Sequence, residues 1–402
     1  MALAALICAY QDAPDSPGGL RATLPLAGRT LVERQVRLAA QAGCSPVVIL
    51  VERVPAELVA VIDRLRSEAL PVLVARSAAD AADAVRTDDQ LLVMADGMVA
   101  GEAHVARLLS IGSEALLTLP DHGSDERYER IDGEVRWAGL AVIDGAALRQ
   151  TAAMLQDWDL QSTLLRRAVQ SGARQLAIRA DPAEAPVVIA ERQSDLALVQ
   201  SRILDRSSGA RDDWASRYLL APLEASVTRA LMPSSLTPTW LYVAAGVLTG
   251  LAAILFAGGW LWIGGSMLLL ATPLDGIAER LAALRLQASG EGSWPARAVP
   301  FLAGSALFAL GYTLAGVYGW GCLVLAISTI TFLWALAGEV SCRRPPERLF
   351  LAERKGMTLL MFPFAIAGAW VTGLAALAIY VAGSFFWAQH EAHRTIKPGQ
   401  QD

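Results

Sequence analysis

Apolar residues divide the 402-residue chain into two halves with different patterns. In residues 1–195, short apolar runs alternate with amphipathic segments, which is typical of a mostly parallel α/β sandwich. The apolar runs predict strands at 3–8, 46–51, 70–75 and 90–95. The amphipathic segments predict helices at 30–43, 55–67, 78–86 and 102–111, and 135–172 predicts a further strand and two helices.

The second half contains three long stretches, 236–274, 298–338 and 356–390, without Asp, Glu, Lys or Arg. Each is about twice the roughly 20 residues that a helix needs to cross a bilayer, so each predicts a helical hairpin. Glycines mark the expected turns near 258–259, 319–321 and 368–373. The pattern therefore predicts six transmembrane helices, because a soluble core would have to bury more than a hundred uncharged residues.

Basic residues gather in the connections between these hairpins. Arg280, Arg285 and Arg297 precede the second hairpin, further Arg and Lys residues at 343–355 precede the third, and Arg394 and Lys397 follow it. This bias places the connections on the cytosolic side. The first ten residues, "MALAALICAY", lack the basic region of a secretory signal. We therefore expect a multi-pass protein of the inner (cytoplasmic) membrane, with its N-terminal domain and C-terminus in the cytosol.

The domain boundaries follow from these patterns. We expect a cytosolic domain at 1–195, a polar linker at 196–213, an interfacial helix at 214–235, a membrane domain at 236–390 and a cytosolic tail at 391–402. In the third of these segments, 214–235, apolar residues recur at helical spacing between Arg217, Glu224 and Arg229. Such a pattern predicts a helix that lies in the membrane interface.

Composition narrows the class of partner. The net charge of −5 and the lack of a basic stripe argue against nucleic acid. The four cysteines lie far apart, without metal-ligand or redox spacing. The uncharged stretches disfavour a transporter, whose spans usually carry ionisable groups. The lipid bilayer is the partner that the sequence indicates.

One connection, residues 272–300, carries a specific set of residues: Asp275, Gly276, Ala282, Gly292 and Trp294. With "SLTPT" at 235–239 and the order of the two halves, it resembles the bifunctional proteins that fuse a sugar-nucleotidyltransferase-like domain to a CDP-alcohol phosphatidyltransferase domain. These are the inositol-phosphate cytidylyltransferase/phosphodiester synthase enzymes. The resemblance implies a GT-A-like α/β sandwich followed by an all-α, six-helix transmembrane domain.

The family signature of the membrane domain implies four Asp residues that hold Mg²⁺ on the CDP pyrophosphate, the last of which takes the proton of the acceptor hydroxyl. Laid on this chain without gaps, only the first falls on an Asp, Asp275. The other three fall on Ala278, Ala296 and Pro300. Glu279 lies one helical turn after Asp275 and is the candidate substitute.

The resemblance assigns the remaining candidate residues. It implies substrate contacts for Gly276, Arg285 and Gly292, and for Arg21, which stands near the position of a family Lys. Asp96 of "LLVMADG" falls on the family's metal-binding Asp, beyond the end of a predicted strand.

Two N-terminal features weaken the expected nucleotide site. Asp96 is also an ordinary turn former before Gly97. "AYQDAPDSPGGL" replaces the family's Gly-rich turn, and its bulky Tyr10 and Gln11 hinder backbone N–H groups from converging on a phosphate.

Two functions remain open. The loss of three signature Asp residues favours a pseudoenzyme with a binding, regulatory or partner role in phospholipid or phosphodiester synthesis, as a homodimer or with an active paralogue. The alternative is an active CDP-alcohol phosphotransferase with a rebuilt Mg²⁺ site at Asp275 and Glu279. If Glu279 pairs with a nearby arginine instead, Asp275 remains as a framework residue.

Overall fold

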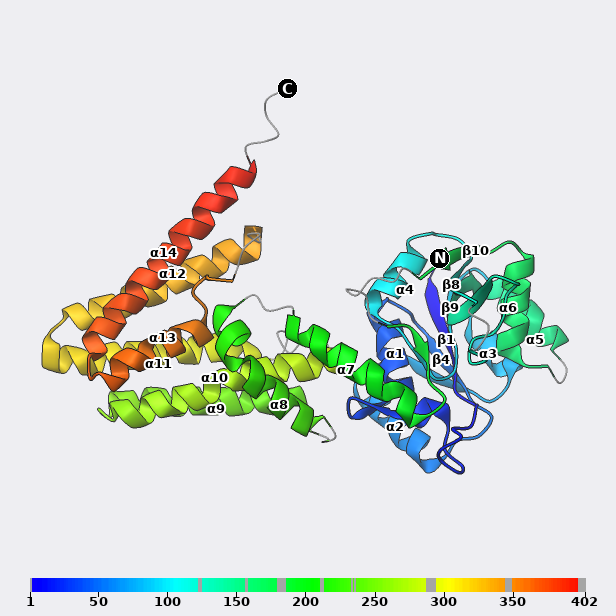
Figure 1. The fold of residues 1–402 in the computed structure, drawn as a ribbon, viewed down its shortest axis with the longest axis horizontal. Coiled ribbons are helices and arrows are strands. Elements are labelled where there is room, and N and C mark those ends of the chain that lie inside the picture. Colours follow the sequence, from blue (N-terminus) through cyan, green and yellow to red (C-terminus); the bar gives the residue numbers. More distant parts are fainter. Residues whose placement is uncertain are drawn as a thin grey trace, which may run out of the picture. The chain divides into compact units, whose positions relative to one another are not determined.

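The computed structural model describes residues 2–121, 125–155, 158–178, 186–209, 213–232, 234, 236–286, 294–343 and 349–396. The chain forms two compact units, Met1–Arg206 and Ser207–Asp402 (Figure 1). The division falls inside the expected linker, 196–213, most of which belongs to helix α7 (Gln193–Gly209).

The N-terminal unit is built on a mostly parallel sheet. Within the described residues, seven strands pair in the order β10-β8-β9-β6-β1-β4-β5, and only β9 runs antiparallel to its neighbours. The strands are β1 (Leu3–Cys8), β4 (Val47–Leu50), β5 (Val72–Ala75), β6 (Gln90–Met94), β8 (Ala115–Pro120), β9 (Val135–Asp144) and β10 (Arg174–Ala177). Two short pairs accompany them: β2 (Pro25–Leu26) with β3 (Arg29–Thr30), and β7 (Met98–Val99) with β11 (Val188–Ile189).

Helices pack against this sheet. They are α1 (Leu31–Gln41), α2 (Ala56–Ser67), α3 (Ala78–Ala84), α4 (Glu102–Leu109), α5 (Gly145–Met154) and α6 (Leu160–Gln170), with a 3₁₀ turn, η1 (Arg21–Thr23). Strands β1, β4 and β6 are buried almost throughout, as expected for parallel strands covered on both faces. The predicted α/β sandwich, with its strands and helices at the expected places, is confirmed.

The C-terminal unit is helical. It begins with a π-helical turn, η2 (Ser216–Leu220), and helix α8 (Ala221–Leu231). The longer helices follow: α9 (Pro238–Ala257), α10 (Leu261–Leu284), α11 (Trp294–Tyr318), α12 (Gly321–Arg343), α13 (Arg354–Ile366) and α14 (Trp370–Ile396). Three hairpin turns contain Gly259, Gly319 and Gly368, whose positive φ angles suit glycine. These are the turns that the sequence predicts.

The expected number of membrane spans needs a correction. Among the described residues, α9, α10, α11, α12 and α14 are long and apolar enough to cross a membrane. Helix α13 is not, because its 13 residues extend only about 20 Å, against a bilayer core of about 30 Å. The third uncharged stretch turns at Gly368, which leaves too few residues before the turn. Five span-like helices therefore replace the predicted six.

The five span-like helices have outward apolar surfaces. In each apolar window, one third or less is buried inside the protein, and the exposed side chains include Trp240, Ile254, Val317 and Ile379. Each of the three hairpin turns has a tryptophan beside it (Trp260, Trp320 and Trp370), and Trp262 and Trp370 of two different hairpins pack edge to face at 5.8 Å. An apolar surface with aromatic residues at the helix ends is typical of a protein in a bilayer.

Candidate functional site

The helical unit contains a cavity of about 1090 Å³ with a polar part and an apolar part. The polar part is lined by side chains of η2, α8, α10, α11 and the start of α13, including Ser216, Glu224, Asp275, Glu279, Arg280, Arg297, Arg354 and Lys355. The apolar part includes Phe256, Leu268, Leu310, Leu336, Met361 and Trp370. A cavity of this composition suits a ligand with a polar head and an apolar body.

Helix α10 carries the retained signature residues into this cavity. Asp275, Gly276 and Glu279 all line it, because residues four apart lie on one face of a helix. The first turns of α11 supply Ala296 and Pro300 to the same cavity. Ala278 is fully buried and does not line it. The structure thus brings two of the replaced positions beside Asp275, and both are apolar.

The two carboxylates of α10 in the cavity lining, Asp275 and Glu279, lie beside cations from the start of α13. Asp275 Oδ2 accepts a hydrogen bond from Arg354 Nη2, and both side chains are less than one fifth exposed. Glu279 Oε2 lies 4.0 Å from Lys355 Nζ and is 56% exposed. Both carboxylates of the expected rebuilt site therefore have a positively charged neighbour.

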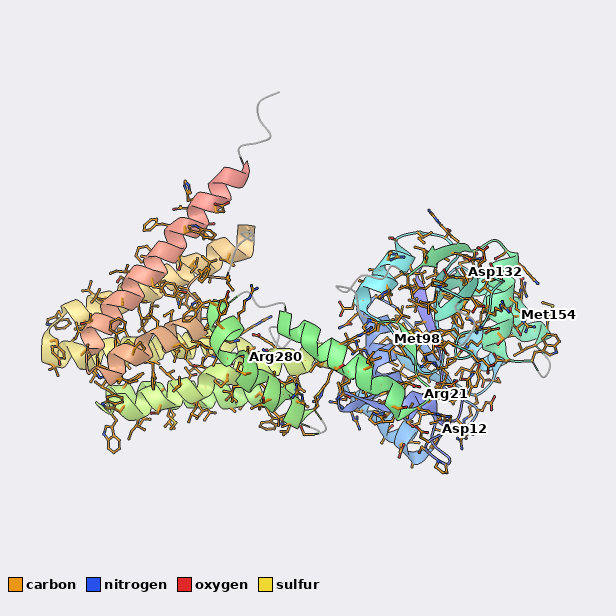
Figure 2. The ribbon with its side chains drawn as sticks, in the orientation of Figure 1. Asp12, Arg21, Met98, Asp132, Met154 and Arg280 are labelled. Carbon is orange, nitrogen blue, oxygen red and sulfur yellow. The ribbon has the colours of Figure 1, made fainter. Side chains whose placement is uncertain are left out.

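A further acid in the cavity, Glu224 of α8, was expected in an interfacial helix between apolar residues. It is 1% exposed and pairs with Arg280 at 2.8 Å, and its other oxygen lies 4.0 Å from Lys355 Nζ. The pairing explains its burial, because an unpaired buried charge is costly. Figure 2 shows Arg280 at this position beside α8.

The burial of Glu224 orients the whole of α8. Its neighbour one turn on, Thr228, is also fully buried. In contrast, Tyr218, Leu219 and Leu223 of η2 and α8 are exposed. The segment turns its polar side inward and its apolar side outward, which suits a helix in contact with lipid.

Gly276 is required by the close packing around Glu224. A Cβ at this position would lie 2.3 Å from Glu224 Oε1 and 3.0 Å from Lys355 Nζ. Only glycine lets the acid of α8 and the lysine of α13 approach α10 this closely. The structure therefore gives Gly276 a packing role at the cavity wall.

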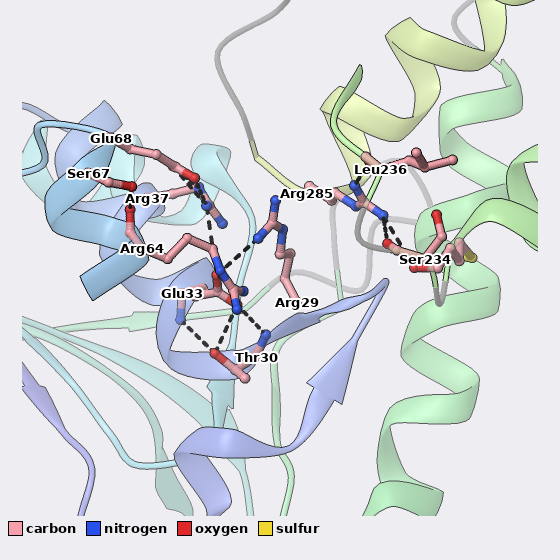
Figure 3. Close-up of polar contacts among 11 residues, drawn as sticks. Arg29, Thr30, Glu33, Arg37, Arg64, Ser67, Glu68, Ser234, Leu236 and Arg285 are labelled. Carbon is pink, nitrogen blue, oxygen red and sulfur yellow. Dashed lines mark hydrogen bonds and ion pairs between the residues drawn. The ribbon is translucent and has the colours of Figure 1, made fainter. Parts of the chain in front are cut away.

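Arg285 lies outside the cavity lining and is 2% exposed. Its guanidinium donates hydrogen bonds to the backbone carbonyls of Leu236 (2.5 Å), Ser234 (2.7 Å) and Met232 (3.4 Å), as Figure 3 shows. These carbonyls belong to the connection between α8 and α9, so Arg285 holds that connection on the end of α10. Gly292, the other expected contact of this segment, lies outside the described residues.

In the N-terminal unit, Asp96 lies just beyond the end of β6, next to the end of β1. Its Oδ2 accepts hydrogen bonds from the backbone N–H groups of Tyr10 (2.8 Å) and Gln11 (2.7 Å). Its Oδ1 is buried and accepts no hydrogen bond from the described residues. Burial raises the pKa of Asp96 to about 7, although the two N–H donors act in the opposite direction.

The loop after β1 is closed upon itself. Besides the N–H groups of Tyr10 and Gln11, those of Ala13 and Arg21 bond to the carbonyls of Gly19 and Gln11. A phosphate cradle needs such N–H groups to point at the ligand. In this loop, these four N–H groups already donate to acceptors within the protein.

Arg21 follows this loop. It forms an ion pair with Glu191 at 2.8 Å, and its Nε donates to the backbone carbonyl of Asp12 at 3.3 Å. Figure 2 labels Arg21 and Asp12 close together at this loop. The contacts make Arg21 a residue that ties the loop to the β11 segment.

The residues of the chain fit a divalent metal poorly. No group of three or more His, Cys, Asp or Glu side chains is arranged for a metal ion in the described part of the chain. Mg²⁺ prefers several oxygen ligands, but one oxygen of Asp275 is bonded to Arg354 and the neighbouring positions are Ala296 and Pro300. At Asp96, one oxygen is bonded to two backbone N–H groups.

Sequence reasoning missed Glu224, Arg354 and Lys355 as site residues. Arg354 and Lys355 entered only as charges that orient the membrane domain, and Glu224 only as a polar residue of an interfacial helix. One signal was present: Glu224 and Thr228 are four residues apart in a mostly apolar helix, so they share one face. Two polar residues on one face of such a helix indicate a buried polar contact.

Comparisons with known proteins give one similar curated sequence and similar solved structures. The sequence is a bifunctional IPC transferase and DIPP synthase from Rubrobacter xylanophilus, 29% identical over 168 residues. The match covers 42% of this chain and 37% of that protein, so it spans well under half of the relative. No family model matches the chain.

Two solved structures are similar to about half of the chain. One is a protein from Bacillus anthracis assigned as a glucose-1-phosphate thymidylyltransferase, with 11% identity, a TM-score of 0.37, and coverage of 51% of this chain and 96% of that one. The other is a 4-diphosphocytidyl-2C-methyl-D-erythritol synthase, with 16% identity, a TM-score of 0.36, and coverage of 50% and 98%.

Proposed function

We propose that this protein is a membrane-bound pseudoenzyme of the CDP-alcohol phosphatidyltransferase type, whose helical unit binds a phospholipid-like amphiphile without metal-dependent transfer. The observation that carries the proposal is the cavity in which Asp275 is bonded to Arg354 while Ala296 and Pro300 stand at two other signature positions. The lining of the cavity suits a ligand, and in the described part of the chain its carboxylates are not grouped for a metal ion.

The chemistry of the cavity favours a lipid-like ligand. Its apolar part is formed by aliphatic and aromatic side chains, which stabilise a hydrocarbon chain by excluding water. At its polar part, Lys355 Nζ donates a hydrogen bond to Ser216 Oγ at 3.1 Å and lies 4.0 Å from oxygens of Glu224 and Glu279. Arg297 adds an exposed guanidinium. These donors suit the oxygens of a phosphate-containing headgroup.

The proposal places the helical unit in the inner membrane with its charged connections in the cytosol. The outward apolar surfaces of the five span-like helices support a bilayer location. The excess of Arg and Lys on the side opposite the hairpin turns supports the orientation.

We assign the N-terminal unit a nucleotidyltransferase-like fold with a regulatory or partner role. The similarity to the Rubrobacter xylanophilus protein and the α/β sheet support the fold. The closed loop after β1, whose N–H groups are bonded to Asp96 and to neighbouring carbonyls, favours a role other than nucleotide transfer. Pairing with a second copy or with an active relative is part of this proposal.

Thermal unfolding of the detergent-purified protein with added lipid tests the proposal. Phosphatidic acid and CDP-diacylglycerol are expected to raise the melting temperature by several degrees in EDTA, because a ligand of the native state stabilises it. Ala303→Phe fills the cavity and should abolish the rise. Ser305→Phe, on the exposed side of the same helix, should preserve it. Equal rises for both variants, or none for the wild type, would rule out this ligand site.

A further inference from the structure

We propose that Arg354 and Lys355 of α13 act as built-in cations that balance the carboxylates of α8 and α10, so that the cavity needs no divalent metal. The inference rests on the proposed function, since it concerns the same cavity, and it states how that cavity came to work without Mg²⁺. It concerns the side chains of this chain alone and involves no reaction step.

The two cations lie between the acids. Arg354 bonds to Asp275 of α10. Lys355 Nζ lies 4.0 Å from an oxygen of Glu224 on α8 and 4.0 Å from an oxygen of Glu279 on α10. One ammonium group therefore lies near carboxylates of two different helices and offsets part of the charge of both.

The charges of the cavity lining nearly cancel. Its acids are Asp213, Glu224, Asp275, Glu279 and Glu353, and its bases are Arg280, Arg297, Arg354 and Lys355, so five negative charges face four positive ones. An added divalent ion would change the net charge of this lining from −1 to +1. Repulsion by the bases and the cost of dehydrating Mg²⁺ both oppose its binding.

The start of α13 is fixed in place by its neighbours. A Cβ on Gly356 would lie 2.8 Å from Trp214 Nε1, so the indole packs directly on this turn. Trp214 Nε1 donates to the hydroxyl of Tyr380 on α14 at 3.0 Å, and that hydroxyl also bonds to the carbonyl of Leu351 at 3.0 Å. Residues before and after α13 thus hold Arg354 and Lys355 against the acids.

The short length of α13 also agrees with the role of Arg354 and Lys355 at the cavity. A helix that crossed the bilayer from this side would have to begin at the headgroup level, where basic residues remain in water. Here Arg354 and Lys355 are 18% and 12% exposed, and both line the cavity. The half-length helix carries its two cations to the acids of α10.

The test compares the melting temperature of the full-length protein in EDTA and in millimolar Mg²⁺. The wild type should show no difference. Arg354→Met leaves Asp275 without its cation, so its melting temperature should fall, and Mg²⁺ should recover about 3 °C or more of the loss. Arg229→Met, an exposed arginine of α8, is the matched control and should show neither effect.

A double variant keeps the test decisive if Arg354→Met fails to fold. Asp275→Asn with Arg354→Met removes both charges, so it should fold and melt independently of Mg²⁺. Stabilisation of the wild type by Mg²⁺, or an Arg354→Met protein that folds without responding to Mg²⁺, would overturn the inference. A double variant as unstable as the single one would also overturn it, since the charge of Asp275 would then not be the cause.

These outcomes are separate from those of the lipid experiment. If lipids fail to stabilise the wild type but Mg²⁺ rescues Arg354→Met, the ligand proposal fails and the built-in cations stand. If lipids stabilise the wild type and Mg²⁺ does not rescue the variant, the reverse holds.

Discussion

At the scale of single residues, the carboxylates of the candidate sites have partners within the protein. Asp275 keeps its signature position but is bonded to Arg354, and Glu224 is buried against Arg280. Asp96 has a different partner, the backbone of the loop after β1. In each case a side chain or N–H group of the protein occupies a carboxylate oxygen that a metal would need.

The packing role of Gly276 predicts a loss of stability on adding one methyl group. Gly276→Ala places a Cβ 2.3 Å from Glu224 Oε1, so it should lower the free energy of unfolding by about 1–3 kcal/mol. Denaturant unfolding of the full chain in detergent measures this. Gly316→Ala, in helix α11 with nothing within 4 Å of its new Cβ, is the control and should be neutral or slightly stabilising. Equal behaviour of the two variants would contradict the packing role.

The buried carboxyl of Asp96 predicts a dependence of stability on pH. Its pKa in the folded protein is raised to about 7, so the stabilisation linked to its protonated form is complete below pH 4 and is lost as the pH rises to about 7. Asp96→Asn does not titrate, so the difference in unfolding free energy between wild type and variant should change by about 4 kcal/mol at most between pH 4 and pH 8.

Pulse proteolysis of the N-terminal unit in the full chain at several pH values measures that difference. Asp83→Asn, at an exposed position of α3, serves as the control. A constant difference between wild type and Asp96→Asn over this pH range would show that the carboxyl of Asp96 is not held in its neutral form.

At the scale of elements, short segments decide the geometry of the site. Helix α8 is anchored to α10 by Glu224 and Arg280, and its connection to α9 is held by Arg285. Helix α13 ends after 13 residues and supplies cations instead of a span. The two shortest helices of the C-terminal unit in the described residues thus form the polar end of the cavity.

The position of Arg285 predicts that it affects stability and not ligand binding. Arg285→Met leaves the carbonyls of Ser234 and Leu236 without their charged donor, so it should cost about 2–3 kcal/mol of unfolding free energy. The rise in melting temperature on adding lipid should be unchanged. Arg297→Met, which lines the cavity and is exposed, should show the opposite: unchanged stability and a smaller rise with lipid. A reduced lipid response for Arg285→Met alone would make Arg285 a ligand contact after all.

At the scale of the whole molecule, the two units differ in how much of their structure can be predicted from the local hydropathy pattern. The strands of the N-terminal unit are short apolar runs such as 3–8 and 90–94, so the α/β sheet is predictable. The hairpin turns at Gly259 and Gly319 are also predictable, because glycines stand near the middle of long uncharged stretches. The prediction of a sixth span is wrong because the whole stretch 356–390 is long enough for two spans, whereas the turn at Gly368 divides it into a short arm and a long one.

The polar end of the cavity also cannot be predicted from local sequence. Glu224 pairs with Arg280, 56 residues away, and Lys355 bonds to Ser216, 139 residues away. Local hydropathy indicates surface positions for the charged residues among them, Glu224, Arg280 and Lys355. Only the packing of α8, α10 and α13 brings them together, so the site could be predicted at Asp275 and Glu279 but not at their partners.

The central claim is that the cavity keeps a lipid site and has lost transfer chemistry. The most direct measurement is the release of CMP when the purified protein, in lipid vesicles, is given CDP-diacylglycerol, Mg²⁺ and a mixture of alcohol acceptors. The account predicts no release above that of protein-free vesicles. Mg²⁺-dependent release of CMP that disappears in Asp275→Asn would contradict it and establish an active transferase with a rebuilt site.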